Sequence, residues 1–287
     1  AAACLHHAWN EGNDRFRNFM SFERHWLEEA GSEDSHGRAM WALGAVVGRT
    51  RQSSLRAWAA GLFEKALPAT ETFTSPRAWA FTILGLHEYL RKLEGDLLVD
   101  RIRIALAQRL FDLAATQSTD SWPWYEPILS YDNARLPQAL ILTGRWTCQP
   151  QLLDRGLQTL RWLVRQQTGH HDCFRPIGSN GFWPKDGEKA LFDQQPLEAT
   201  ATVSACLEAH AATGDPFWLS EAMRAFEWFL GHNDLNLPLY DAATGGTHDG
   251  LHANRANRNQ GAESTLSFLI ALSEMKFRLN SMAAFHG

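Results

Sequence analysis

Acidic side chains recur in four polar segments of the chain, each just ahead of a stretch with helical periodicity. The segments span residues 31–38, 130–138, 192–199 and 259–264, with a poorer copy at 74–79. Their carboxylates include Asp34, Asp132, Asp193 and Glu263. Hydrolysis of a glycosidic bond needs two carboxyls flanking the scissile bond, one protonated and one ionised. We therefore expect these four residues to form a catalytic acid set.

The same segments and three loops carry groups suited to binding sugars. Amides, carboxylates and guanidinium groups bind hydroxyls, and indole rings stack on the C–H faces of sugar rings. Twelve Trp against four Tyr is a high tryptophan content, and several of these Trp lie in loops. The expected substrate-binding residues are Glu33, His36, Arg38, Trp122, Trp124, Tyr125, Asn133, Arg135, Asn180, Trp183, Gln194, Gln195, Glu198, Asn259 and Gln260.

Each of these assignments has a structural alternative. Asp, Ser and Asn just before a helix are common N-caps, each contributing about 1 kcal/mol, and Asp34 or Ser35, Asp193 and Asn259 fit that role. A loop Trp can equally cover the core. Capping does not explain the polar residues that enter otherwise apolar helices, such as Glu198, because burying them without partners costs several kcal/mol.

Helical periodicity dominates the chain, and no run of alternating strand residues is present. We expect helices near 1–9, 35–47, 52–66, 76–93, 97–117, 133–144, 150–167, 196–213, 216–230 and 261–276.

Amphipathic helices alternate with segments that are small or apolar on every side, as at 39–47, 199–207 and 264–272. Helices apolar all round are buried all round. This alternation predicts an all-α, single-domain α/α toroid (barrel) of about five hairpins, with inner and outer helix rings. An upstream helix would complete a sixth hairpin. The inner helices of such a fold begin at one mouth, where the four acids would meet.

Composition excludes several other classes. With 45% apolar residues and a net charge of −5, nothing favours a nucleic acid or an anionic membrane as a partner, and no apolar run approaches the roughly 20 residues of a spanning helix. No Gly-x-Gly-x-x-Gly or Walker pattern is present, and His248, His252 and Asp249 lack a recognised metal-ligand spacing. Four scattered cysteines favour a reducing, cytoplasmic setting. We expect no cofactor and no metal.

Five blocks resemble a bacterial helical domain that occurs alone or beside glycosyltransferase modules. They are residues 15–44, DNARLPQALI (132–141), RPIGSNGFWP (175–184), DQQPLEATATVSACLEA (193–209) and NQGAESTLSFLIAL (259–272). The domain is similar in turn to the six-hairpin glycosidase superfamily, through architecture and scattered acidic positions. The resemblance implies a glycoside hydrolase, with an inverting mechanism favoured, and a possible glycosyltransferase partner.

Three other functions remain open. The chain could be a non-catalytic glycan-binding or scaffolding module serving a glycosyltransferase. It could be a sugar epimerase or isomerase, for which His pairs in the mouth are expected, although only His36 lies in one of the polar segments. A polysaccharide lyase would use a Tyr base near Arg and Asn, as at Tyr131, Asn133 and Arg135.

Overall fold

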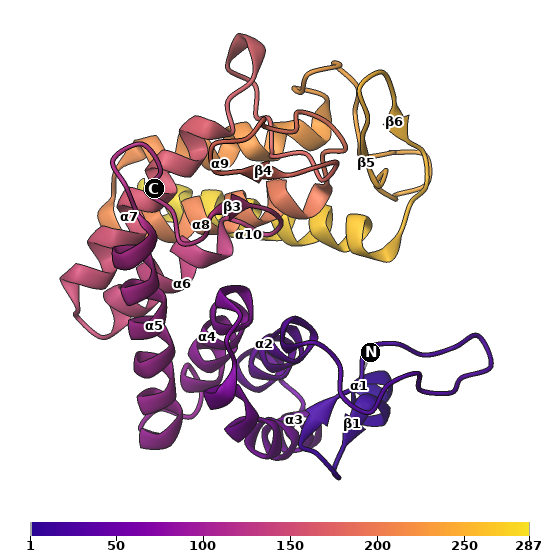
Figure 1. Cartoon of the computed structure of the whole chain (residues 1–287), viewed down its shortest axis with the longest axis vertical. Helices are drawn as coiled ribbons and strands as arrows, with labels where there is room; N and C mark the ends of the chain where they lie inside the picture. The colour runs from indigo at the N-terminus through magenta and orange to yellow at the C-terminus, as the bar shows by residue number, and fades with distance from the viewer. Residues whose placement is uncertain (1, 287) are drawn as a thin grey trace. The chain divides into compact units, whose positions relative to one another are not determined.

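The structure is a computed structural model that describes residues 2–286, with side chains to residue 281, and it is predominantly helical (Figure 1). Within these residues all ten helices predicted from periodicity are confirmed, and α10 continues beyond its predicted end. They are α1 (Ala2–Ala8), α2 (Glu33–Arg49), α3 (Ser53–Ala66), α4 (Pro76–Leu90), α5 (Leu97–Gln117), α6 (Arg135–Trp146), α7 (Pro150–Gln166), α8 (Pro196–Thr213), α9 (Pro216–Glu227) and α10 (Ala262–His286).

The loops contain short ribbons and single helical turns. Three antiparallel pairs of two-residue strands are β1 (Trp9–Asn10) with β2 (Arg15–Phe16), β3 (Ile128–Leu129) with β4 (Trp183–Pro184), and β5 (Gly250–Leu251) with β6 (Ala256–Asn257). The 3₁₀ turns are η1 (Pro68–Thr72), η2 (His170–Asp172) and η3 (Trp228–Leu230). None of the described helices has both the length and the apolar character needed to cross a bilayer.

The chain divides into two compact units. Unit 1 comprises the described part of Ala1–Leu113 together with Leu142–Leu153, and unit 2 comprises Ala114–Ile141 with the described part of Asp154–Gly287. Asp34 therefore belongs to unit 1, whereas Asp132, Asp193 and Glu263 belong to unit 2. A single domain whose acids share one mouth stays a prediction.

In unit 1, α2 and α4 pack with their backbones in contact. A Cβ atom added to Gly44 of α2 would lie 2.1 Å from the carbonyl oxygen of Gly85 in α4, so only glycine allows this approach. Nearly every residue of α4 from Arg77 to Tyr89 is buried. The amphipathic α3 packs against α2. The helix α4 is thus the most enclosed helix of this unit, although the segment before it, residues 74–79, is the poorest copy of the polar segments.

In unit 2, α8 is the central helix and packs against α9 and α10. It is buried almost continuously from Glu198 to Leu207, as its small and apolar sequence predicts. The Thr200 hydroxyl donates to the Ser267 carbonyl of α10 at 2.9 Å. The prediction that 264–272 is buried all round is wrong, because α10 uses one face against α8 and leaves Leu266 56% exposed.

Candidate functional site

Asp193 lies where an isolated antiparallel bridge joins two loops of unit 2. The bridge pairs Gln194, just before α8, with Leu251 of β5 through N–H···O bonds of 3.0 and 2.9 Å. In an antiparallel pair the residue before one bridge position faces the residue after the other. Asp193 therefore faces His252, and its Oδ1 is hydrogen-bonded to the ring Nδ1. The two side chains remain 36% and 32% exposed, so the pair is open to solvent.

The backbone of Asp193 is held in a left-handed conformation, with φ at +58°. This conformation costs a non-glycine residue roughly 1–2 kcal/mol, although Asp tolerates it better than most. Its carbonyl accepts hydrogen bonds from the Ser179 N–H at 3.0 Å and the Ser179 hydroxyl at 2.9 Å. The N-cap of α8 is Gln195, which makes no side-chain cap bond. Asp193 is thus fixed by its loops and does not cap α8.

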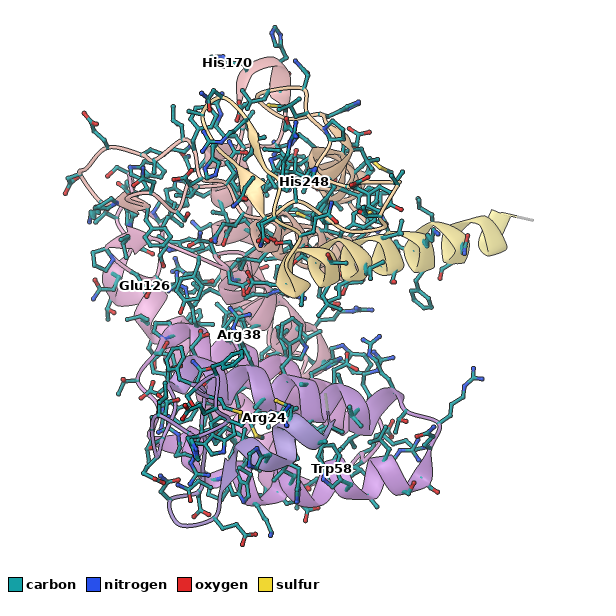
Figure 2. The ribbon with its side chains drawn as sticks, turned by 90° about the vertical axis from the view of Figure 1, so that its right-hand side faces the viewer. Arg24, Arg38, Trp58, Glu126, His170 and His248 are labelled. Atoms are coloured by element: carbon teal, nitrogen blue, oxygen red, sulfur yellow. The ribbon has the colours of Figure 1, made fainter. Side chains whose placement is uncertain are left out.

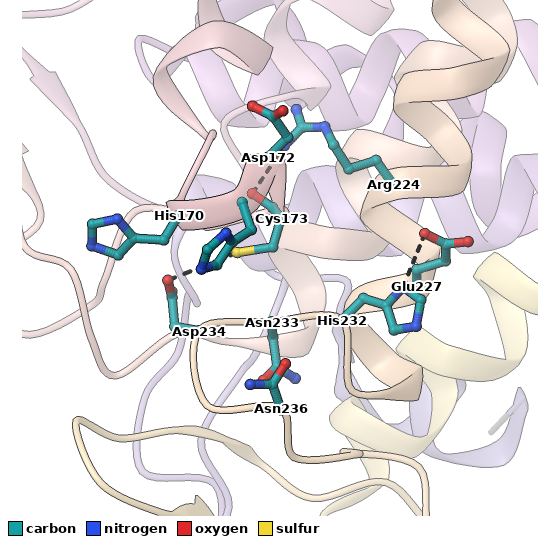
Figure 3. Close-up of a pocket in the computed structure, with 10 residues that line it drawn as sticks. His170, Asp172, Cys173, Arg224, Glu227, His232, Asn233, Asp234 and Asn236 are labelled. Carbon is teal, nitrogen blue, oxygen red and sulfur yellow. Dashed lines mark hydrogen bonds and ion pairs between the residues drawn. The ribbon is translucent and has the colours of Figure 1, made fainter.

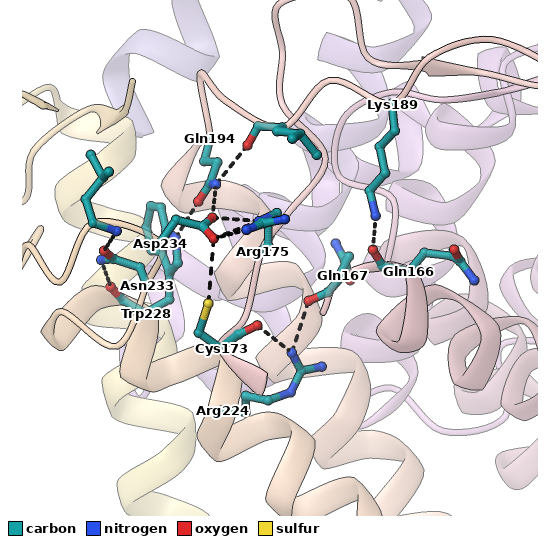
Figure 4. A network of polar contacts seen from close by, with 12 residues as sticks. Gln166, Gln167, Cys173, Arg175, Lys189, Gln194, Arg224, Trp228, Asn233 and Asp234 are labelled. Atoms are coloured by element: carbon teal, nitrogen blue, oxygen red, sulfur yellow. Dashed lines mark hydrogen bonds and ion pairs between the residues drawn. The ribbon is translucent and has the colours of Figure 1, made fainter. Parts of the chain in front are cut away.

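Gln194, the next residue in the chain, belongs to a buried polar network with Asp234 and Trp228 (Figure 4). Its amide nitrogen donates to Asp234 Oδ2 at 2.7 Å and to the Leu191 carbonyl at 2.9 Å, and its oxygen accepts from Trp228 Nε1 at 2.8 Å. Asp234 also forms an ion pair with Arg175. The Gln194 side chain is fully buried and its amide is bonded to protein groups, and substrate binding by this residue stays a prediction.

A second carboxylate cluster joins the starts of α6 and α8. Glu198 accepts hydrogen bonds from the backbone N–H of Asp132 and from the side-chain amide of Asn133, the latter at 3.2 Å. Asp132 in turn lies 3.4 Å from Arg135 Nε. All four side chains are buried. These side chains are held by contacts within the chain, and their expected roles at a substrate stay predictions.

The Glu198 carboxyl has a pKa raised from 4.5 to about 7. Burial is the largest cause because it disfavours the charged form, and the nearby Asp132 carboxylate adds to it. Hydrogen bonds from the N–H groups of Asp132 and Asn133 act in the opposite direction. Glu198 is thus a buried acid whose charge near neutral pH depends on its surroundings.

The expected aromatic platform is mostly core. Trp124 and Tyr125 have no exposed surface and Trp122 is only 4% exposed, and their stacking on sugar stays a prediction. Trp122 packs edge-on against Trp162 of α7, and the Tyr125 hydroxyl is 2.9 Å from that of Thr159. These rings face inward because α7 supplies an apolar surface beneath their loop.

Trp183, Asn180 and Gln195 keep exposed surface, with Trp183 and Gln195 half-buried and Asn180 exposed. The Trp183 ring is nearly parallel to Trp162, at 14° and 6.1 Å, and the Lys189 ammonium lies 5.2 Å from its centre. The expectation that these three residues contact a ligand stays a prediction.

The loop before α10 holds its amides in local contacts. Asn259 donates to Asp249, which accepts from the Gly261 N–H at 2.7 Å at the helix start. Gln260 donates to Asp241 at 3.0 Å. Asn259 therefore supports Asp249, and it does not cap α10. Glu263 is exposed in the first turn of α10, and its catalytic role stays a prediction.

Of the four unit 1 residues, two have structural roles. Glu33 accepts from the N–H groups of Thr74 and Ser75 at 2.8 and 2.7 Å and so stabilises the start of α4. His36 is fully buried, with Nε2 3.0 Å from the Ala66 carbonyl, and burial lowers its pKa to about 4. Both side chains are thus engaged within the chain, and substrate binding by them stays a prediction.

The other two unit 1 residues form a partly exposed ion pair. Arg38 projects from α2 (Figure 2) and donates to Asp34 at 2.9 Å, with 37% and 24% of the side chains exposed. The cap of α2 is Ser32, so the capping alternative for Asp34 is wrong. A catalytic role for Asp34 stays a prediction.

A separate cavity of about 260 Å³ lies between η2, the end of α9 and the loop after η3 (Figure 3). It contains none of the residues expected from the sequence. Its wall includes His170, His171 and His232, and Asp234 connects it to the Gln194 network. No group of three His, Cys, Asp or Glu side chains in the described part of the chain is arranged to hold a metal ion.

The functional candidate that sequence reasoning missed is His252. From the sequence it was considered only as a metal ligand, because His248 and Asp249 lie in the same loop. Its partnership with Asp193 depends on pairing between residues 59 apart, which single-sequence patterns do not report. The Arg175–Asp234 pair beneath the site was missed for the same reason.

No protein-family model matches the chain, and no curated protein matches it in sequence. Solved structures do match. An unsaturated glucuronyl hydrolase specific for heparin has a TM-score of 0.66 and 12% identity, over 96% of this chain and 76% of that one. The cellobiose 2-epimerase of Spirochaeta thermophila has a TM-score of 0.64 and 11% identity, over 96% and 78%. A D-mannose isomerase has a TM-score of 0.66 and 10% identity, over 94% and 78%.

The chain therefore has the all-α fold of the α/α toroid glycosidases and epimerases, and the predicted fold class is confirmed. At 10–12% identity this likeness defines the fold. The reaction has to be argued from the side chains.

Proposed function

We propose that this chain is a carbohydrate-active enzyme that hydrolyses a glycosidic bond in an oligosaccharide or polysaccharide, with Asp193 as a carboxylate that contacts the substrate. The fold neighbours named above act on glucuronyl groups, cellobiose and mannose, which supports a carbohydrate substrate. The proposal is at the level of reaction class and names no particular sugar.

The observation that carries this proposal is the half-exposed carboxylate of Asp193 on a fixed, left-handed backbone at the start of α8. Backbone strain of this kind persists where the surroundings over-determine it, often at functional sites. Asp193 neither caps its helix nor joins the buried network beneath it. A carboxylate held open to solvent in this way can act on a substrate.

Glycoside hydrolysis needs a second carboxyl, and we propose Glu263 of the same unit for this role. Its side chain is exposed in the first turn of α10. An inverting reaction requires the two carboxyls to be about 6.5–9.5 Å apart, and a retaining reaction about 5 Å. The resemblance stated from the sequence favours inversion, which the anomeric configuration of the first product would test.

Asp193→Asn tests the proposal directly. We expect turnover of manno- or gluco-oligosaccharides to fall by at least about 100-fold, the usual loss for a general acid or base, with the melting temperature nearly unchanged. The matched control is Asp186→Asn, which changes an exposed aspartate with a similar φ of +65° in a neighbouring loop. Chromatography of the products measures both variants. Full activity in Asp193→Asn would refute the role of this carboxylate.

A sugar epimerase or isomerase is the second candidate, and the His252 imidazole against Asp193 favours it. Such an enzyme would exchange a substrate C–H proton with solvent, so incubation in heavy water would label an unhydrolysed sugar. The non-catalytic alternative, a module serving a glycosyltransferase, predicts saturable oligosaccharide binding with neither product nor label. One set of incubations followed by NMR separates these three outcomes.

A further inference from the structure

The position of His252 is fixed independently of its ring. Its backbone N–H donates to the Arg255 carbonyl at 2.9 Å, which closes the turn between β5 and β6. The preceding residue, Leu251, is fully buried and pairs with Gln194 in both directions. The imidazole thus projects from a hydrogen-bonded turn toward a carboxylate whose own backbone is hydrogen-bonded to Ser179.

The contact also determines which atoms are left for chemistry. A carboxylate accepts hydrogen bonds and donates none, so donation from the ring to Asp193 requires the imidazole proton on Nδ1. This bond restrains rotation of the Asp193 carboxylate through Oδ1. With 36% of the side chain exposed, Asp193 keeps surface toward solvent. Side chains fixed in this way are preorganised for reaction, because they need no reorientation when a substrate binds.

Stability alone does not account for the pair. Ion pairs that are about one-third exposed contribute little to folding, since water screens them. The buried Gln194–Leu251 bridge already holds the two loops together. The additional effect of the His252 ring is to orient the Asp193 carboxylate through its hydrogen bond to Oδ1.

We propose that His252 is a positioning residue that orients the Asp193 carboxylate toward a bound sugar. This inference rests on the proposed function, and it assigns His252 a role through Asp193 rather than direct contact with the scissile bond.

The test compares His252→Ala with His252→Asn in the full chain. The asparagine side-chain nitrogen can occupy the place of Nδ1 and donate to Asp193, whereas alanine cannot. We expect kcat to fall roughly 10- to 100-fold in His252→Ala, since displacements of about 1 Å cost up to 100-fold. KM and the melting temperature should stay unchanged, and His252→Asn should recover most of kcat. The control, His232→Ala, removes another surface imidazole that contacts a carboxylate, that of Glu227 at 3.3 Å.

Two results with an active wild-type chain would overturn the inference. Unchanged kcat in His252→Ala would mean that the ring has no part in turnover. Equal loss in His252→Asn and His252→Ala would mean that the imidazole itself transfers a proton, as an epimerase requires. Absence of turnover or label in the wild-type chain across the sugar panel would instead remove the proposed function, and the positioning role with it.

Discussion

Glu198 gives the sharpest quantitative prediction. In the folded chain its pKa is raised from 4.5 to about 7, chiefly by burial and then by the Asp132 carboxylate. Between these two pH values the folded state binds more protons at this position than the unfolded state does. Stability is therefore highest below pH 4.5 and is lost as pH rises through 7. A shift of this size corresponds to about 3 kcal/mol, at about 1.4 kcal/mol per pH unit.

The replacement Glu198→Gln keeps the side-chain length and removes the titration. The Gln oxygen can still accept from the Asn133 amide. The Gln NH₂ group, however, would face the Asp132 N–H, and two donors cannot bond to each other. We therefore expect Glu198→Gln to be less stable than the wild type by a constant amount at acid pH. The informative quantity is the pH dependence. From pH 4 to pH 8 the free energy of unfolding of the wild type should fall by about 3 kcal/mol relative to that of Glu198→Gln.

Denaturant titrations at several pH values, followed by circular dichroism, measure this difference. Glu126→Gln is the control, because it makes the same substitution at a glutamate of unit 2 that is only half-buried. Parallel pH curves for wild type and Glu198→Gln would refute the reasoning. A wild type that gains stability relative to the variant at high pH would show that the hydrogen bonds donated to the Glu198 carboxylate by Asp132 and Asn133 outweigh the effect of its burial.

Two further predictions concern unit 1. Burial lowers the pKa of His36 to about 4. The contribution of the neutral His36 to folding stability is therefore fully present above pH 6.5 and is lost as pH falls through 4. His36→Gln should remove about 3 kcal/mol of this acid destabilisation, measured by the same denaturant titrations. Gly44→Ala should destabilise the chain by at least about 1–3 kcal/mol, because its Cβ would lie 2.1 Å from the Gly85 carbonyl. Gly61→Ala in α3 has nothing within 4 Å and should instead stabilise by about 0.5–1 kcal/mol, and equal melting temperatures for the two variants would contradict this account.

The helices could be predicted because their information is local. A spacing such as Leu153, Leu157 and Leu160 in α7 repeats with the helical period, and Pro196 and Gly214 mark the two ends of α8. Burial all round was predictable for α8, whose sequence is apolar on every side. It failed for α10, where the apolar Leu266 remains 56% exposed.

The site was less predictable because its decisive contacts are long-range. Glu33 stabilises α4 from 42 residues away, at Ser75. His252 is brought to Asp193 by a bridge between two loops whose register no local pattern encodes. The burial of Trp124 also depends on the partner surface of α7. Residue type suggested a chemistry, but only the pairing of loops shows which of these side chains lie together and keep exposed surface.

The buried polar side chains illustrate this distinction best. The sequence argument held that polar groups entering an apolar helix need partners, which water or a ligand would supply. The need is real, but for Gln194 and Glu198 the partners are Asp234, Trp228 and Asn133. A polar cluster at a helix start is thus weak support for a ligand once its bonds are satisfied internally. Stronger support comes from a polar group that is fixed in place yet exposed, and in unit 2 the Asp193–His252 pair meets both conditions.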